Sequence, residues 1–138
     1  MARLVQLQLC SNARFTIGGV SMSFAEVKIF QVLPDKVEAF EMLVVRMTRF
    51  QTSSPGCQAI RYLKRFYTYD DGIQDPPRPL KKVVGAIRYC SYWEFDSLEN
   101  YHAATQEYFA QFEKLLRKLL KTPFDIHCGY TLGEVQDD

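Results

Sequence analysis

The sequence has few cysteines, and none of them lies close to another. The four cysteines, Cys10, Cys57, Cys90 and Cys128, are scattered singly along the 138 residues. Zinc sites and thiol redox motifs use closely spaced pairs such as Cys-x-x-Cys, so the sequence offers no site of either kind. We therefore expect reduced thiols that behave as small apolar side chains.

The sequence also lacks a surplus of one charge and a long apolar run. Lys and Arg number 17 against 16 Asp and Glu, a formal net charge of +1, which provides no global field to hold a nucleic acid. No apolar run approaches the roughly 20 residues that cross a bilayer, and the first residues do not form the continuous apolar segment of a signal peptide. These absences predict a cytoplasmic protein that binds neither nucleic acid nor membrane.

Apolar and aromatic side chains, in contrast, are plentiful. They make up 47% and 14% of the residues, which suffices for one substantial core in a chain of this length. The stretch MSFAEVKIF, which begins at Met22, resembles the start of a domain. We therefore predict a single domain over residues 22–138 and an N-terminal extension over residues 1–21, in which alternating apolar residues suggest an additional strand.

Six elements are predicted after Met22. They are a strand over residues 24–33, a helix from Pro34 to before Ser53, a strand over 57–67, a strand over 83–94, a helix over 96–121 and a closing strand over 124–132. Alternating β-branched and aromatic residues favour the strands, and apolar residues three and four apart favour the helices. Asp35 with Glu38 and Asp96 with Glu99 are predicted capping pairs. Residues 68–80, with three prolines, predict an exposed connection between two strands.

This β-α-β-β-α-β order predicts an α+β, ferredoxin-like domain with four antiparallel strands and both helices on one face. The third strand carries apolar residues on both of its faces. One row is Val83, Ile87, Tyr89 and Trp93, and the other is Val84, Ala86, Cys90 and Tyr92. Because helices cover one face only, we expect a homodimer whose two sheets face each other and close an α/β barrel. A monomer that tolerates an apolar face is the alternative.

Local patterns accompany this order of elements. Residues 55–57, Pro-Gly-Cys, open the second strand, and Trp93, His102 and Tyr108 follow the spacing Trp-x8-His-x5-Tyr into the second helix. Residues 23–132 therefore resemble the antibiotic biosynthesis monooxygenases, a family of dimeric α/β barrels that includes cofactor-independent, quinone-forming monooxygenases and haem-degrading enzymes. The resemblance implies a homodimer and an oxidoreductase that needs no cofactor.

Three positions depart from the pattern of that family. Ser91 stands where many relatives carry a Glu, and Glu107 stands where they carry a second His. The first strand also lacks the Asn on which the haem-degrading relatives rely. We therefore expect no haem, and a pocket whose polar groups differ from those of the relatives.

The candidate site combines the end of the third strand with the second helix. His102 falls on the helical stripe that is predicted to face the sheet, and Trp93 is expected at the mouth of the pocket. A cofactor-free oxygenation of a phenol or an anthrone needs an aromatic-lined cavity and a group that removes a proton. His102 titrates in the right range, so we predict it as the catalytic base. The predicted substrate-binding residues are Ser91, Trp93, Thr105, Glu107, Tyr108 and Phe109.

A second interpretation stays open. His102 could be a core histidine and Trp93 a packing anchor, and the protein would then be a non-catalytic barrel that binds a hydrophobic metabolite or only assembles. His127 and Cys128 do not predict a metal site, because adjacent strand residues point to opposite faces. We therefore expect no metal and no cofactor.

Overall fold

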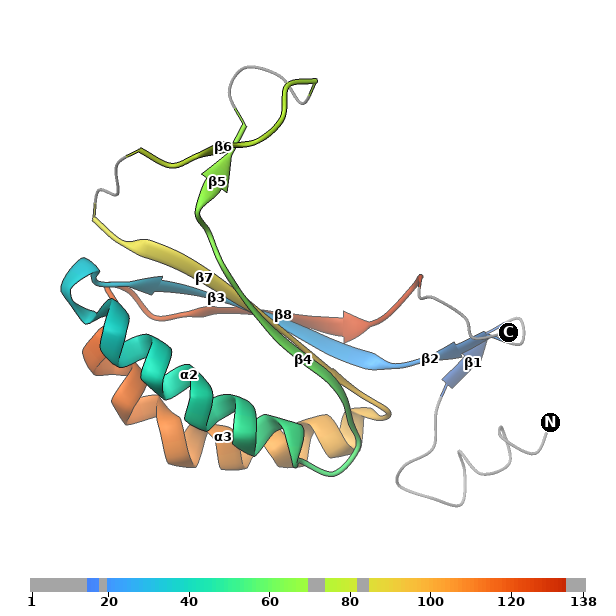
Figure 1. Cartoon of the computed structure of the whole chain (residues 1–138). Coiled ribbons are helices and arrows are strands. Elements are labelled where there is room, and N and C mark those ends of the chain that lie inside the picture. Colours follow the sequence, from blue (N-terminus) through green and yellow to red (C-terminus); the bar gives the residue numbers. More distant parts are fainter. Residues whose placement is uncertain (1–14, 18–19, 70–73, 82–84, 134–138) are drawn as a thin grey trace.

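The computed structural model describes residues 15–17, 20–69, 74–81 and 85–133. Two long helices cover one face of a four-stranded antiparallel sheet (Figure 1). The elements are, in chain order, β3 (Phe24–Val32), α2 (Val37–Thr52), β4 (Cys57–Lys64), β7 (Ile87–Phe95), α3 (Leu98–Leu119) and β8 (Asp125–Tyr130). Their order is the predicted one, so the α+β, ferredoxin-like class is confirmed.

The register of the sheet decides which side chains face the helices. The strand order is β4-β7-β3-β8. Lys28 of β3 lies opposite Ser91 of β7, and Glu26 lies opposite Trp93. Directly opposed residues share a face of the sheet. All but one of the helix-facing residues of these two central strands are buried, and Ile87 is partly buried. The buried ones are Phe24, Glu26, Lys28, Phe30, Val32, Tyr89, Ser91, Trp93 and Phe95.

Neither helix starts at its predicted capping pair. A single 3-10 turn, η1 (Pro34–Lys36), precedes α2, and the residue before α2 makes no side-chain capping bond, so Asp35 is not a cap. Ser97 caps α3 instead of Asp96, because its Oγ accepts a hydrogen bond from the Asn100 N–H at 3.2 Å. Ser97 also has the extended backbone that an N-cap requires.

No helix among the described residues combines the length and the apolar character that a membrane crossing needs.

No helix of the described residues covers the second face of the sheet (Figure 1). We call it the bare face. Its residues, which alternate with the helix-facing ones, are Ala25, Val27, Ile29, Gln31, Ala59, Arg61, Leu63, Arg88, Cys90, Tyr92, Glu94, Asp125, His127 and Gly129. Apolar side chains are numerous on it, as predicted, although Val83 and Val84 of the predicted rows lie outside the described residues. The carboxylate of Glu94 accepts hydrogen bonds there from Ser23 at 2.5 Å and from Tyr92 at 2.8 Å.

A short two-stranded ladder projects from the end of the sheet. Its strands are β5 (Tyr67–Thr68) and β6 (Arg78–Pro79), and Tyr67 pairs with Pro79. We call residues 66–69 and 74–80 the arm; residues 70–73 lie outside the described part. The arm stands on the side of the bare face, away from the helices (Figure 1). The predicted exposed connection therefore exists, and it carries a ladder of its own.

The beginning of the chain forms a separate pair of strands. These are β1 (Phe15–Ile17) and β2 (Val20–Met22), which pair with each other in a two-stranded sheet. The alternating apolar residues over 5–9 lie outside the described residues. The boundary between an extension over 1–21 and a domain over 22–138 stays a prediction.

Gly56 provides a test of how the chain turns from α2 into β4. Its φ is +83°, and a Cβ there would lie 2.5 Å from Asn100 Nδ2 and closer still to Asp96 Oδ1. We expect Gly56→Ala to lower the free energy of unfolding by about 2 kcal/mol or more, because it adds left-handed strain to a clash. Gly133→Ala, with open space around it, is the control and should change that free energy by less than about 0.5 kcal/mol. Urea denaturation measures both, and equal effects would contradict this account.

Candidate functional site

Two opposite charges are buried together between the sheet and the helices. Glu26 and Lys28 lie two residues apart on β3, so both point to the helix-facing side, and both are fully buried. Lys28 Nζ forms an ion pair with Glu26 Oε2. A buried charge without a partner is very costly, so each of these groups makes the other tolerable.

Aromatic rings enclose the ammonium group of Lys28. Its Nζ lies 4.1 Å from the ring centroid of Tyr108, 5.4 Å from that of Trp93 and 5.9 Å from that of Phe109. These distances allow attraction between the cation and the π faces of the rings. Burial lowers the pKa of Lys28 from its usual value, and the charge of Glu26 opposes part of that shift.

Tyr101 completes the surroundings of the Glu26 carboxylate. Its hydroxyl donates to Glu26 Oε1 at 2.7 Å, so each carboxylate oxygen has a partner. Burial and the adjacent charge of Glu26 raise the pKa of Tyr101 far above its usual value, which keeps its hydroxyl protonated as a donor. The ring of Tyr101 packs against those of Phe24 and Phe95 at centroid distances of 4.9 and 5.7 Å.

A layer of polar side chains continues from Lys28 toward β4 and α2. Ser91 lies between Lys28 and Tyr62 in the register of the sheet, and the Tyr62 hydroxyl donates to Gln51 Oε1 at 2.7 Å. Within the part of the chain that the structure describes, Ser91 Oγ and Gln51 Nε2 are buried without a hydrogen-bond partner. An unpaired buried donor costs about 1–3 kcal/mol. The layer therefore holds two buried polar atoms without a partner among the described residues.

Trp93 lies beside this layer and is completely buried. Its indole Nε1 makes no hydrogen bond of ordinary geometry to the described residues. It faces the Cys57 thiol, a weak acceptor. Burial raises the pKa of that thiol, and the indole N–H opposes part of the rise.

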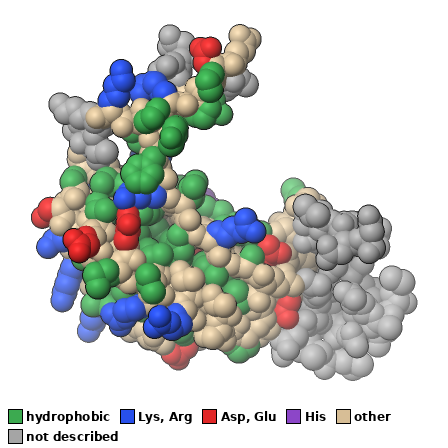
Figure 2. Space-filling view, viewed as in Figure 1, with side chains coloured by type: hydrophobic (Ala, Val, Ile, Leu, Met, Phe, Trp, Pro, Cys, Tyr) green, Lys and Arg blue, Asp and Glu red, His purple; other side chains and the backbone are tan. Residues whose placement is uncertain are grey.

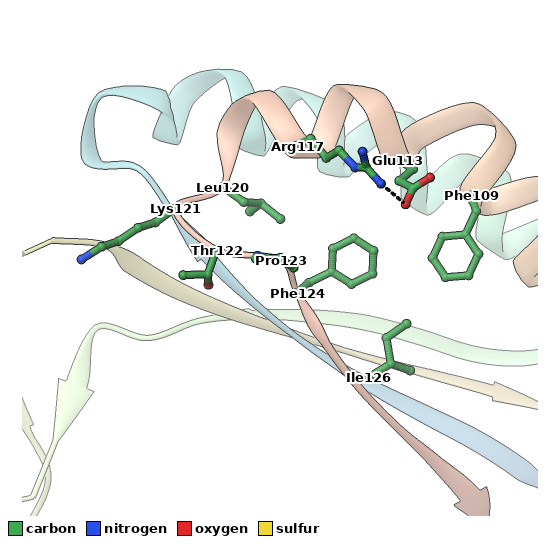
Figure 3. Close-up of a pocket in the computed structure, with 9 residues that line it drawn as sticks. All are labelled: Phe109, Glu113, Arg117, Leu120, Lys121, Thr122, Pro123, Phe124 and Ile126. Carbon is green, nitrogen blue, oxygen red and sulfur yellow. Dashed lines mark hydrogen bonds and ion pairs between the residues drawn. The ribbon is translucent and has the colours of Figure 1, made fainter.

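A cavity of about 590 Å³ opens between the end of α3 and β8. Its lining residues are Phe109, Glu113, Arg117, Leu120, Lys121, Thr122, Pro123, Phe124 and Ile126 (Figure 3). The rings of Phe109 and Phe124 are stacked, with centroids 6.1 Å apart and planes inclined by 15°. On the helix side, Arg117 pairs with Glu113 at 3.0 Å. The cavity thus has an aromatic wall and a charged rim, which suits a small aromatic ligand.

The cavity adjoins the buried ion pair. Phe109 lines the cavity and lies 5.9 Å from Lys28 Nζ. Ile126, another lining residue, lies directly opposite Lys28 in the register of β3 and β8. Phe109 is only partly buried. Phe109 therefore contacts both the cavity and the surroundings of the Lys28 ammonium group.

Four of the predicted substrate-binding residues come together around Lys28. Trp93, Tyr108 and Phe109 supply the surrounding rings, and Ser91 is its neighbour across the strands. Whether they bind a substrate stays a prediction. Their convergence gives it a defined place in the fold.

Thr105 and Glu107 do not join this group. Thr105 is buried, but its hydroxyl donates to the backbone oxygen of His102 at 2.9 Å. Glu107 is exposed and lines a different cavity of about 260 Å³ between α2 and α3. Their assignment to the substrate site finds no support in the geometry.

The expectation that His102 faces the sheet is wrong. His102 is exposed, and the buried stripe runs through Tyr101, Thr105 and Tyr108 instead. Successive residues of an α-helix are rotated by about 100°. An error of one position in the predicted buried stripe therefore moves a side chain from the core to the solvent. The hydrogen bond from Tyr101 to Glu26 and the cap at Ser97 fix the observed phase.

Glu26 and Lys28, which lie at the centre of the candidate site, were not among the residues predicted from the sequence. The stretch FAEVKIF contained a signal of this pair. Phe24, Glu26, Lys28 and Phe30 are two residues apart along the strand, so their side chains share one face. Two charges on the same face as two phenylalanines indicate a buried pair if that face is the one that the helices cover.

No group of three or more metal-ligating side chains occurs within the described ranges.

Comparisons with known proteins identify the fold. No protein-family model matches the sequence, and no curated protein matches it. A solved structure from Nitrosomonas europaea, described as a "putative antibiotic biosynthesis monooxygenase", is 15% identical with a TM-score of 0.59, and the match covers 80% of this chain and 90% of that chain. SnoaB from Streptomyces nogalater, described as a cofactor-independent oxygenase, is 17% identical with a TM-score of 0.52, over 83% and 95% of the two chains.

A third structure, described as a dimeric ferredoxin-like protein from an uncultured marine organism, has a TM-score of 0.58. It is 14% identical, and the match covers 84% of this chain and all of that one. At these identities the similarity shows the fold. The chain has the ferredoxin-like fold of structures that carry the name of the predicted family, so the predicted resemblance is confirmed at the level of structure.

A double-mutant cycle tests the buried ion pair. Lys28→Met should lower the free energy of unfolding by about 3–5 kcal/mol, because it leaves Glu26 buried without its counter-charge. Adding Glu26→Gln removes that charge and keeps an acceptor for Tyr101, so we expect the double variant to be more stable than Lys28→Met alone. Denaturant unfolding at one fixed protein concentration measures each variant.

The control for this cycle is Lys64→Met. Lys64 pairs with Glu41 at 2.5 Å at the surface, where such pairs contribute about 0–1 kcal/mol. If the effects of Lys28→Met and Glu26→Gln simply add, the two groups are not coupled and this description of the site is wrong.

Proposed function

We propose that this protein is a cofactor-independent monooxygenase that acts on a small, electron-rich aromatic compound of the phenol or anthrone type. The observation that supports the proposal most directly is the buried Lys28–Glu26 pair, enclosed by three aromatic rings and adjacent to an aromatic-walled cavity. The structural neighbour SnoaB is described as an oxygenase of this kind.

The reaction balances without a redox cofactor. The CH₂ group of an anthrone reacts with one O₂ to give the C=O group of a quinone and one H₂O, and the substrate supplies all four electrons. The protein has to remove a proton and stabilise the anion that then meets O₂. The Lys28 ammonium can stabilise that anion, and the Glu26 carboxylate, which Tyr101 orients, can accept the proton.

The unpaired polar atoms fit a ligand with an oxygen acceptor. Ser91 Oγ and Gln51 Nε2 lie in the same buried layer as Lys28. They can donate to a phenolate or carbonyl oxygen once a ligand enters. His102 has no part in this proposal, since its side chain faces away from the layer.

We further propose that the protein is a homodimer that packs through its bare face. That face exposes Val27 of β3 and Leu63 of the edge strand β4. Cys90 and Ile29 lie in the same row as Leu63, on the two inner strands. Apolar surface of this kind is stabilised when a second sheet covers it. A neighbour of the same fold is described as dimeric.

Oxygen uptake tests the enzymatic proposal. Anthrone is supplied, and consumption of O₂ is followed together with the formation of anthraquinone. Lys28→Met and Glu26→Gln should each reduce kcat at least about 100-fold, the range seen when a charge-stabilising group is removed. His102→Ala is the control and should leave kcat within about twofold. Near-ultraviolet circular dichroism checks that each variant is folded.

The outcomes separate two functions. Loss of activity in His102→Ala together with full activity in Lys28→Met would place the reaction elsewhere and overturn the proposed roles. If anthraquinone protects the wild-type protein against heat but no O₂ is consumed with any phenol or anthrone, the protein is a non-catalytic barrel that binds aromatic metabolites.

Light scattering tests the dimer. We expect the wild-type protein to have twice the mass of the chain at micromolar concentration, and Val27→Asp to shift it to a monomer, because a charge would be buried in the interface. Met42→Asp, at an exposed position of α2 on the opposite side, is the matched control and should remain dimeric. A wild-type protein that is monomeric at this concentration would refute the proposal.

A further inference from the structure

The cavity at the end of α3 adjoins the Lys28 ammonium group, and two smaller cavities do not. The smaller ones, of about 310 and 260 Å³, lie between α2 and α3. The rings of Trp93, Tyr108 and Phe109, which surround the ammonium group, line neither of them. Figure 2 shows charged side chains among the hydrophobic ones over the helices. The larger cavity therefore offers an aromatic compound a path toward the ion pair.

One stripe of α3 forms the helix side of this cavity. Its members are Phe109, Glu113, Arg117 and Leu120, which follow one another at steps of four or three residues and so share one face of the helix. Phe109 stands at the end of the stripe farthest from Lys121, and its ring points toward the sheet near Ile126 (Figure 3). Ile126 lies directly opposite Lys28 in the sheet. Phe109 and Ile126 therefore close the end of the cavity that is nearest the ion pair.

Phe109 is the least restrained of the three rings around the ammonium group. Trp93 and Tyr108 are completely buried, and the Tyr108 hydroxyl donates to Met47 Sδ at 3.2 Å. Phe109 is partly buried, and its side chain has no polar atom that a hydrogen bond could hold. Its ring packs against those of Tyr108 and Phe124, at centroid distances of 5.8 and 6.1 Å. The size of this side chain can therefore change without the loss of a hydrogen bond.

We propose that Phe109 is a specificity-determining residue, because its ring is the partition between the aromatic cavity and the buried ion pair. This rests on the proposed function, since a substrate that gives its proton to Glu26 has to pass the ring. The side chain at position 109 then limits the size of the aromatic compound that reaches the pair. In an apolar pocket, one methylene group already changes the preference between two substrates by about 10–200-fold. A smaller side chain at position 109 should therefore favour larger substrates.

The preference between a three-ring and a two-ring substrate tests the partition. Anthrone is compared with 1-naphthol, which reacts with one O₂ to give 1,4-naphthoquinone and one H₂O. Phe109→Ala should raise the ratio of kcat/KM for anthrone to kcat/KM for 1-naphthol at least about tenfold, and Phe109→Trp should lower it. The ratio is insensitive to a loss of folded protein, because such a loss reduces both rates equally.

The matched control is Phe124→Ala. It removes the other ring of the stacked pair that lines the same cavity. We expect it to lower both kcat/KM values by a similar factor, so that their ratio stays within about threefold of the wild-type value.

The accessibility of Lys28 gives a second measurement that needs no substrate. Its side chain is fully buried, so reductive methylation of its amine with formaldehyde and a borane should be slow in the wild-type protein. Phe109→Ala should accelerate it at least about tenfold, and Phe124→Ala should not. Peptide mass spectrometry measures the rate, with the exposed Lys118 as an internal standard.

The outcomes separate the partition from the proposed reaction. If no variant consumes O₂ with either compound, the proposed reaction fails, and the ratio of the two dissociation constants, measured by calorimetry under argon, tests the partition instead. Binding of neither compound would overturn both proposals. The partition alone is overturned if Phe109→Ala leaves either the ratio or the methylation rate unchanged. It is also overturned if Phe124→Ala changes them equally, because the total volume of the cavity would then decide the preference.

Discussion

The burial of Lys28 beside Glu26 constrains the side chains that surround the pair. Lys28 and Glu26 lie in the layer where sheet and helices meet, and neither could stay charged there alone. Tyr101 from α3 satisfies the second oxygen of Glu26, and Tyr108 from the same helix covers the ammonium. The helix must therefore present these two tyrosines, seven residues apart, to the sheet. This requirement sets the rotation of α3 about its own axis, and at that rotation the His102 side chain faces the solvent.

The same arrangement explains why the interior is chemically unusual. Most residues of the helix-facing layer are large and apolar, yet its centre holds a charged pair, a serine and a glutamine. An apolar centre of equal volume would often be at least as stable. Two polar atoms of this centre, Ser91 Oγ and Gln51 Nε2, have no partner among the described residues, and buried polar groups of this kind normally have one, such as water or a ligand. The aromatic-walled cavity at Phe109 lies next to this centre.

The sheet separates two roles by its two faces. Its helix-facing side holds the candidate reaction site, and its bare side holds the surface that we assign to the dimer. Alternation along β3 and β7 produces this division, because adjacent residues point to opposite faces. Ser91 and Tyr92 are neighbours in the chain, yet one lies beside Lys28 and the other holds Glu94 on the far side.

The sequence by itself determined the order of the elements and the fold. Strand alternation, helical spacing and the breaks at Pro34 and Pro123 depend on local chemistry, which the residues carry with them. It also predicted Trp93, Tyr108 and Phe109 for one candidate site, and their rings lie around one ammonium group in the structure. Only the tertiary structure decided that Lys28 is their common neighbour, because β3 pairs with β7 through residues that are 55 positions apart in the chain at Val32 and Ile87 and 71 apart at Phe24 and Phe95. The tertiary structure also decided the orientation of His102. The sequence pattern fits a buried stripe through Tyr101 or through His102, because aromatic residues occur in both stripes, and local spacing cannot distinguish the two.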